Sequence, residues 1–205
     1  WGGAQDDFPA TLEREIEPGT VNHYVSINTH VLGMILKQAT GRTITDYMQE
    51  KLYNPLGMEY EGYWIVDEEG MEMALGGLNV TMRDYAKIGS LFLHEGNWQG
   101  QQIVPASWVK ASVTPDAPHL QPGEDFGYGY QWWIPMPQEG PNKGDYTAAG
   151  IYGQYIYVNP ARGIVIAKNA ADREFAYPQD GYGHSMNVNM DMFRSLADYY
   201  GGESE

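Results

Sequence analysis

Apolar residues recur at helical spacing near the start of the chain, and this pattern predicts a helical hairpin. The apolar stripe of its first helix consists of Val31, Leu32, Ile35, Leu36 and Ala39. This helical period begins near residue 29 and stops at Gly41, a residue type that commonly ends helices. Thr43, with Asp46 three residues later, predicts the start of the second helix, which the turn at 54–57 ends.

The next two segments also carry helix signals. Thr81 and Asp84 form a second capping pair, and an apolar stripe follows them. That stripe consists of Tyr85, Ile88 and Phe92. Pro105 then opens a short helix that carries Trp108. We therefore expect a mainly helical lobe over residues 24–112.

Aromatic and β-branched runs in the second half of the chain predict strands. The segments expected to form one antiparallel sheet lie around 128–134, 146–158 and 164–169. A last amphipathic stripe predicts a helix over 185–198 that packs on this sheet. Helices followed by an antiparallel sheet indicate the α+β class. The length favours a single domain over residues 1–205, with the sheet and the terminal helix in 113–205.

Composition narrows the classes of function. The chain has 27 acidic and 12 basic residues, and a net charge of -15 repels phosphate backbones and anionic lipid headgroups. Its apolar runs are too short to cross a bilayer, so we expect neither nucleic-acid binding nor membrane insertion. The absence of cysteine and of any His pair at i,i+4 spacing excludes thiolate and helical zinc sites. We expect no metal and no cofactor.

Three segments carry groups suited to catalysis. Tyr24 and Ser26 place a phenol and a hydroxyl before the first helix, and a tyrosine can act as a general base if a nearby ammonium lowers its pKa. Residues 76–81 form a glycine-rich turn that contains an asparagine. An exposed backbone N–H at Ile151 could polarise a carbonyl oxygen. Core packing of Tyr24 and a β-bulge at 150–154 are the structural alternatives.

Taken in order, these segments resemble the serine β-lactamase and penicillin-binding-protein-like hydrolases. The resemblance is to the branch that holds class C-like enzymes, family VIII carboxylesterases and 6-aminohexanoate-dimer hydrolases. Residues 24–26 (Tyr-Val-Ser) are similar to the family's Tyr-x-Asn or Tyr-x-Ser motif, and residues 76–84 to its Gly-Gly-Leu-x-x-Thr-x-x-Asp segment. Residues 148–150 (Ala-Ala-Gly) stand where the family has Lys/His-Thr-Gly. The resemblance runs from about Glu17 to Leu196 and implies a serine β-lactamase-like fold of bacterial origin.

The chain departs from the family pattern in two places. Its third motif lacks the Lys or His and the Thr that pair with a substrate carboxylate, so we expect an ester or amide substrate. The family's Ser-x-x-Lys motif lies many residues before the Tyr motif, whereas only 23 residues, none of them serine, precede Tyr24. We expect a fold that is incomplete at the N-terminus. An upstream segment would then supply the nucleophile, and that segment or a partner chain would cover the sheet.

One Ser-x-x-Lys string does occur, at Ser107 and Lys110 in the helix that Pro105 opens. Its spacing would place both side chains on one helical face. So short a string carries little weight by itself, and in the family this stretch is a surface helix remote from the site. We therefore do not expect Ser107 to be the nucleophile.

The resemblance implies roles for individual residues. Lys from the upstream segment and Tyr24 would move protons, and the N–H of Ile151 would join that of the serine as the oxyanion hole. The residues implied near the substrate are Ser26, Asn79, Tyr128, Tyr130, Trp132, Ala149 and Gly150. Asn79 could equally cap a helix, and core packing would explain the three aromatic residues almost as well.

Two other functions remain open on the sequence. A non-catalytic binding module on the same fold could use the 6 Trp and 16 Tyr residues as stacking platforms. A glycosidase with paired carboxylates fits least, because carboxylate pairs are common on so acidic a surface. Relatives occur both exported and in the cytoplasm, and the resemblance favours the periplasm or secretion.

Overall fold

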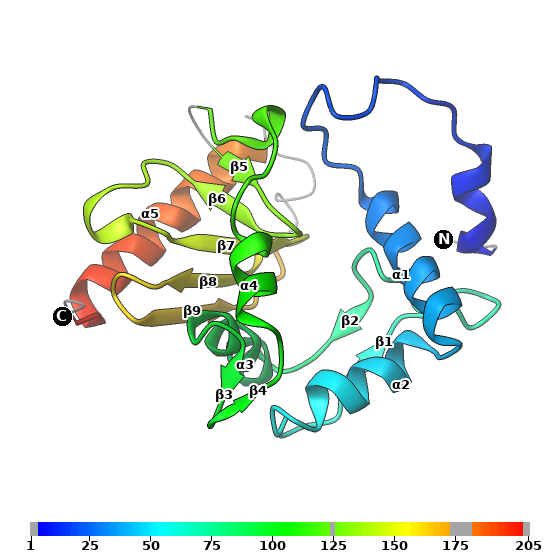
Figure 1. Ribbon diagram of the computed structural model, residues 1–205, viewed down its shortest axis with the longest axis horizontal. Coiled ribbons are helices and arrows are strands. Elements are labelled where there is room, and N and C mark those ends of the chain that lie inside the picture. The colour runs from blue at the N-terminus through cyan, green and yellow to red at the C-terminus, as the bar shows by residue number, and fades with distance from the viewer. Residues whose placement is uncertain (1–3, 124–125, 173–181, 203–205) are drawn as a thin grey trace. The chain divides into compact units, whose positions relative to one another are not determined.

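The computed structural model describes residues 4–123, 126–172 and 182–202 (Figure 1). Its internal contacts divide the chain into one unit over Trp1–Asp84 and another over Tyr85–Glu205. The elements of the first unit are mainly helical, and the second unit contains a five-stranded sheet. The expected lobes over 24–112 and 113–205 remain a prediction.

The first unit confirms the local helix signals. Its elements are η1 (Gln5–Thr11), α1 (Ser26–Thr40), α2 (Ile44–Met48), the π-helical turn η2 (Gln49–Tyr53), and the antiparallel strands β1 (Tyr63–Trp64) and β2 (Leu78–Asn79). Gly41 follows α1 with a left-handed φ of 66°. The Thr43 hydroxyl accepts a hydrogen bond from the Asp46 N–H at 3.0 Å and so caps α2.

The buried face of α1 differs from the stripe that the sequence predicts. His30 and Gly33 are buried, whereas Leu32 and Ile35 are 53% and 57% exposed. Gly33 permits a close approach, because a Cβ there would lie 2.6 Å from the Cβ of Ala74. The buried face of α1 is therefore formed by a polar residue and a glycine. A pattern of apolar residues does not identify such a face.

The second unit confirms an antiparallel sheet, but the segment 128–134, expected to be one strand, is wrong as such: it contains the turn between β5 and β6, because the aromatic run continues through the turn at 129–132. Its elements are α3 (Met82–Leu93, which starts just before the unit boundary), β3 (Asn97–Trp98), β4 (Gln101–Gln102), α4 (Ala106–Ser112), η3 (Pro118–Leu120), β5 (Phe126–Tyr128), β6 (Trp133–Pro135), η4 (Gly140–Asn142), β7 (Tyr146–Gly150), β8 (Gln154–Asn159), β9 (Ile164–Lys168) and α5 (Tyr182–Tyr200). The strands β5 to β9 follow one another in sheet order as well as in sequence, and each neighbouring pair is antiparallel. This order is a simple meander, in which short turns join β5 to β6, β7 to β8 and β8 to β9, and a longer connection that contains η4 joins β6 to β7.

Helices cover both faces of the sheet, and the central strand β8 separates the two cores. Tyr155 and Tyr157 pack with Phe193 of α5, and α5 crosses behind the strands in Figure 1. Ile156 and Val158 point to the other face and pack with residues of α3. Successive side chains of a strand point to opposite faces, and both faces of β8 are buried. Residues 155–158 are therefore all apolar or aromatic. The predicted packing of the terminal helix on the sheet is confirmed.

The apolar stripe of α3 faces the sheet. Ile88 and Phe92 pack against the core cluster that holds Ile156 and Val158. A Cβ at Gly89 would lie 2.6 Å from Cγ1 of Val165, so this glycine sets the close distance between α3 and the strands. The sequence identified this stripe but counted it with the helical lobe, since periodicity does not say which partner a helical face contacts.

A buried ion pair links α5 to the start of β7. The Arg194 Nε donates to Asp145 Oδ2 at 2.8 Å, and its Nη2 donates to Oδ1 at 3.1 Å. The Tyr157 hydroxyl donates to the same carboxylate at 2.9 Å, and Arg194 Nη1 donates to the Met136 carbonyl at 2.8 Å. Burial raises the pKa of the Asp145 carboxyl, and the hydrogen bonds from Arg194 and Tyr157 oppose this rise. The buried charge of Asp145 and that of Arg194 therefore each require the other to offset the cost of burial.

Replacing Arg194 tests this dependence. Arg194→Met is expected to lower the free energy of unfolding by about 3 to 5 kcal/mol, because Asp145 loses the cation that compensates its burial. Arg83 is exposed, so Arg83→Met is the control and should change stability by about 0.5 kcal/mol or less. Urea denaturation followed by tryptophan fluorescence measures both. Equal stability of the two variants would show that α5 does not need the ion pair.

Candidate active site

Tyr24 lies in the irregular segment before α1, and its side chain is 42% exposed. Ser26 is the first residue of α1 and is exposed. This exposure does not fit the core-packing alternative for Tyr24. Burial of part of its ring raises the pKa of the Tyr24 phenol, so the group keeps its proton at neutral pH. A general-base role for Tyr24 therefore requires a cation beside it.

Asn79 lies in β2 and not at a helix cap. It pairs with Tyr63 of β1, and its side-chain amide donates to the Gly77 carbonyl at 3.0 Å. The Thr81 hydroxyl instead accepts from the Asp84 N–H at 3.3 Å, and it donates to the Asp84 carboxylate at 2.9 Å. Thr81 thus caps α3 as predicted. The capping interpretation of Asn79 is wrong, because Thr81 occupies the N-cap position of α3.

A tight turn at the end of β7 carries Ile151. Gly150 pairs with Gln154 across β7 and β8, so residues 151–153 form the connection. Tyr152 has a left-handed φ of 64°. The side chain of Ile151 is 53% exposed, and its N–H has no acceptor among the residues that the structure describes. The continuous register of β7 and β8 contradicts the β-bulge alternative, and no described residue accepts from the Ile151 N–H.

The two edges of β7 beside this turn are paired to different extents. Within the described ranges β6 pairs with β7 only at Thr147, so residues 148–150 have a strand partner on the β8 side alone. The Ala149 side chain packs against the core on the α5 side of the sheet. A Cβ at Gly150 would lie 3.1 Å from the Cβ of Gln154. The backbone groups along this edge can therefore pair with an extended ligand.

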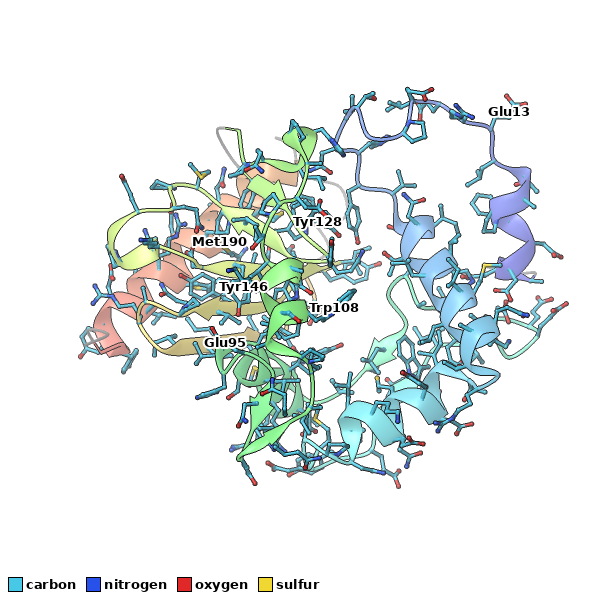
Figure 2. The ribbon with its side chains drawn as sticks, in the orientation of Figure 1. Glu13, Glu95, Trp108, Tyr128, Tyr146 and Met190 are labelled. Atoms are coloured by element: carbon cyan, nitrogen blue, oxygen red, sulfur yellow. The ribbon has the colours of Figure 1, made fainter. Side chains whose placement is uncertain are left out.

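The two tyrosines at the end of the β5–β6 hairpin have different neighbours. Tyr128 is half-buried, and its ring centroid lies 4.7 Å from that of Trp133. Tyr130 is 40% exposed, donates to the Asp116 carboxylate at 2.8 Å, and lies 5.4 Å from the ring of Trp108, which Figure 2 labels on α4. The hydrogen bond to Asp116 raises the pKa of the Tyr130 phenol. The strand register places this hairpin turn and the β7–β8 turn at the same end of the sheet.

Trp132 belongs to the core on the α3 side. Its side chain is 5% exposed, and its ring centroid lies 4.6 Å from that of Phe92 and 5.1 Å from that of Tyr146. Trp132 is therefore a core residue, as the core-packing alternative expected, because a side chain enclosed by these rings offers little surface to a substrate.

The candidate residues fall into two groups. Tyr24, Ser26 and Asn79 belong to the first unit, whereas the β5–β6 and β7–β8 residues belong to the second. Register brings the candidates of the second unit to one end of the sheet. The convergence of both groups on one cleft remains a prediction.

The structure also shows a brace on the β7–β8 turn that the sequence pattern does not predict. The Ala170 N–H donates to Gln154 Oε1 at 3.3 Å, and Gln154 Nε2 donates to the Ala170 carbonyl. The Asp172 N–H donates to the Tyr152 carbonyl at 3.1 Å. A polar Gln154 at the start of an apolar strand was the available signal, but its partner lies too far along the sequence for a local pattern to identify.

The Ser-x-x-Lys string on α4 lacks the geometry of a nucleophile and its base. Ser107 and Lys110 are both exposed, and no hydrogen bond joins their side chains. Over the described residues no group of three or more His, Asp or Glu side chains is arranged to hold a metal ion. The helices described here include none with the length and apolar character needed to span a bilayer.

Known proteins similar to this chain are hydrolases and β-lactamase-like proteins. The family model Beta-lactamase matches residues 4–180. The chain is 29% identical over 169 residues to the 6-aminohexanoate-dimer hydrolase of Paenarthrobacter ureafaciens, a match to 79% of this chain and 42% of that protein. A Bacillus anthracis structure described as a 6-aminohexanoate-dimer hydrolase has a TM-score of 0.80 and 30% identity, over 95% of this chain and 48% of the other.

A more distant structure confirms the expected α+β, β-lactamase-like fold. It comes from Bacteroides dorei, is described as a β-lactamase, and has a TM-score of 0.68 and 21% identity, over 92% of this chain and 62% of the other. The chain spans less than half the length of the two 6-aminohexanoate-dimer hydrolases, at 42% and 48%.

The segment that carries Asn79 depends on close packing at Gly77. A Cβ there would lie 2.8 Å from Met73 Cβ and 2.9 Å from the Met73 carbonyl oxygen, whereas a Cβ at Gly76 would meet nothing within 4 Å. Gly77→Ala is expected to lower the free energy of unfolding by about 1 to 3 kcal/mol through overpacking. Gly76→Ala is the matched control and should leave thermal stability nearly unchanged. Thermal denaturation compares the two, and equal melting temperatures would contradict the packing argument.

Proposed function

Because the chain belongs to the β-lactamase family, we propose that it forms the C-terminal part of a serine hydrolase that cleaves an ester or amide through an acyl-enzyme. The observation that carries this proposal is the Ile151 N–H, in an exposed turn at the end of β7. A backbone donor so placed can stabilise the oxygen anion of a tetrahedral intermediate. The 6-aminohexanoate-dimer hydrolases that the chain matches support hydrolysis as the reaction.

In the proposed reaction, a serine from an upstream segment attacks the carbonyl carbon of the substrate. A lysine of that segment and Tyr24 take the serine proton and deliver it to the leaving group. The N–H groups of Ile151 and of the serine bind the negative oxygen. Water then attacks the acyl-enzyme and releases the acid. The lysine charge also offsets the effect of burial, which raises the pKa of Tyr24 in this chain.

The composition of β7 supports an ester or linear amide as the substrate. Ala148 and Ala149 supply neither a cation nor a hydroxyl where β-lactam-recognising relatives have both. The open edge at 148–150 leaves backbone groups for an extended substrate. The other proposed substrate contacts come from Ser26, Asn79, Tyr128 and Tyr130.

Two exposed surfaces support the upstream segment. In the described part of the chain β9 pairs with β8 alone, so its other edge is open. The outer face of α5 exposes Val188, Met192 and Leu196 by 54%, 40% and 37%, at i, i+4 and i+8. Open strand edges and apolar stripes are usually covered in folded proteins. Since the matched hydrolases are about twice as long as this chain, we assign that cover to an upstream segment of the same protein.

Removal of the Tyr24 hydroxyl tests its proton-transfer role. In the full-length protein Tyr24→Phe should lower kcat for ester hydrolysis by about 10²- to 10⁴-fold, the loss typical of an acid–base group. Tyr60 is also exposed, and Tyr60→Phe is the control that should keep the unaltered kcat. Steady-state kinetics with a chromogenic short-chain ester measure both. Equal rates for the two variants would remove Tyr24 from the mechanism.

The isolated chain should lack hydrolase activity, because it contains no Ser–Lys pair at the expected position. The 205-residue chain and the full-length protein are incubated with the same ester and with a fluorophosphonate that labels reactive serines. Turnover and stoichiometric labelling are expected only in the full-length protein. Labelling of Ser107 with turnover in the isolated chain would contradict the proposal. A folded full-length protein without either signal would favour the non-catalytic binding module.

A further inference from the structure

The turn that carries Ile151 is held by side chains on both strands that follow it. Gln154, the first residue of β8, forms two hydrogen bonds with the backbone of Ala170. Lys168, the last residue of β9, donates from Nζ to the Gly153 carbonyl at 3.2 Å. The segment 168–172 therefore braces the turn through side-chain contacts as well as through the backbone contact at Tyr152.

The conformation of the turn explains why such a brace is needed. Tyr152 has a φ of 64°, which residues with a side chain rarely adopt, and Gly153 follows with a φ of 84°. Residues 151–153 form the whole connection, and Ile151 and Tyr152 are exposed, so contacts from outside the turn help to select this conformation. Hydrogen bonds to the carbonyls of Tyr152 and Gly153 fix the peptide planes of the turn.

The contacts of Lys168 indicate positioning and not proton transfer. Its ammonium donates to the Gly153 carbonyl and lies 5.4 Å from the ring centroid of Tyr155, its partner across β8 and β9. In both contacts Lys168 acts as a donor or a cation, and an ammonium has no lone pair to accept a proton. Gln154 cannot exchange a proton at neutral pH, so its two hydrogen bonds also act through geometry.

We propose that Gln154 and Lys168 are positioning residues that hold the β7–β8 turn so that the Ile151 N–H meets the oxyanion of the reaction. This inference rests on the proposed function, because it assumes that Ile151 is an oxyanion donor. Such a donor must be placed within about 0.5 Å to stabilise a transition state. Loss of the brace therefore affects kcat more than substrate binding.

The test uses the full-length protein and two pairs of variants. Gln154→Ala and Lys168→Met each remove one part of the brace. Gln101→Ala and Lys143→Met replace exposed residues of the same unit and are the matched controls. Hydrogen–deuterium exchange, read by mass spectrometry on peptides that contain residues 150–153, reports the order of the turn. Steady-state kinetics with the chromogenic ester give kcat and KM separately.

Each brace variant should show faster exchange in the turn peptide and a kcat lowered by about 10- to 100-fold, with KM changed less than about twofold. Controls should match the unaltered enzyme in both measurements. Unchanged exchange in an active enzyme would overturn the positioning role and leave the proposed hydrolase intact. Faster exchange with unchanged kcat would show that the brace is real but that Ile151 is not the oxyanion donor, which overturns the catalytic part of both proposals. A full-length protein without any hydrolysis would overturn the proposed function itself, and the inference with it.

Discussion

Burial of both faces of β8 is the constraint on which the sheet unit depends. Tyr155 and Tyr157 must reach the α5 side while Ile156 and Val158 reach the α3 side. A shift of register by one residue would exchange these two sets and place each against the wrong helix. The core therefore fixes how β8 pairs with its neighbours. The pairing of Gly150 with Gln154, and with it the position of the β7–β8 turn, follows from that fixed register.

Strand β7 is held at both of its ends. At its start, Asp145 is bound by Arg194 of α5, and Arg194 also holds the backbone at Met136. At its other end, Gln154 and the segment after β9 restrain the turn. Between these ends, the side chains of residues 148–150 are small or absent, and no described strand pairs with their edge on the β6 side. A strand fixed in this way can present its backbone to a ligand without relying on the side chains of the usual motif.

In this arrangement the proposed hydrolase activity does not depend on the side chains of the family's third motif, from which the chain departs. The proposed contribution of Ile151 is a backbone N–H, which every residue except proline provides. A substitution at 148 or 149 therefore alters what the site can recognise and leaves the backbone donor in place. The groups that would complete the reaction, a serine and a lysine, are assigned to a segment that would also cover α5 and β9. Catalysis and completion of the hydrophobic surface would then depend on the same part of the protein.

The sequence by itself determined the elements whose signals are local. Gly41, the Thr43–Asp46 pair and the Thr81–Asp84 pair each act within a few residues of a helix end, and the structure confirms all three. The β-branched runs at 155–158 and 164–168 identified β8 and β9, and the short turn between them predicted their antiparallel pairing. The run at 128–134 was expected as one strand, whereas it holds the turn between β5 and β6. The ordered motifs also led to the correct family.

Only the tertiary structure decided which surfaces these elements present. It turned His30 and Gly33 inward on α1, and it placed Trp132 in the core and Asn79 in a strand. It also formed the contacts between Gln154 and Ala170, 16 residues apart, and between Asp145 and Arg194, 49 residues apart. Local propensity acts over one or two turns of chain, whereas such contacts arise only when packing brings distant segments together.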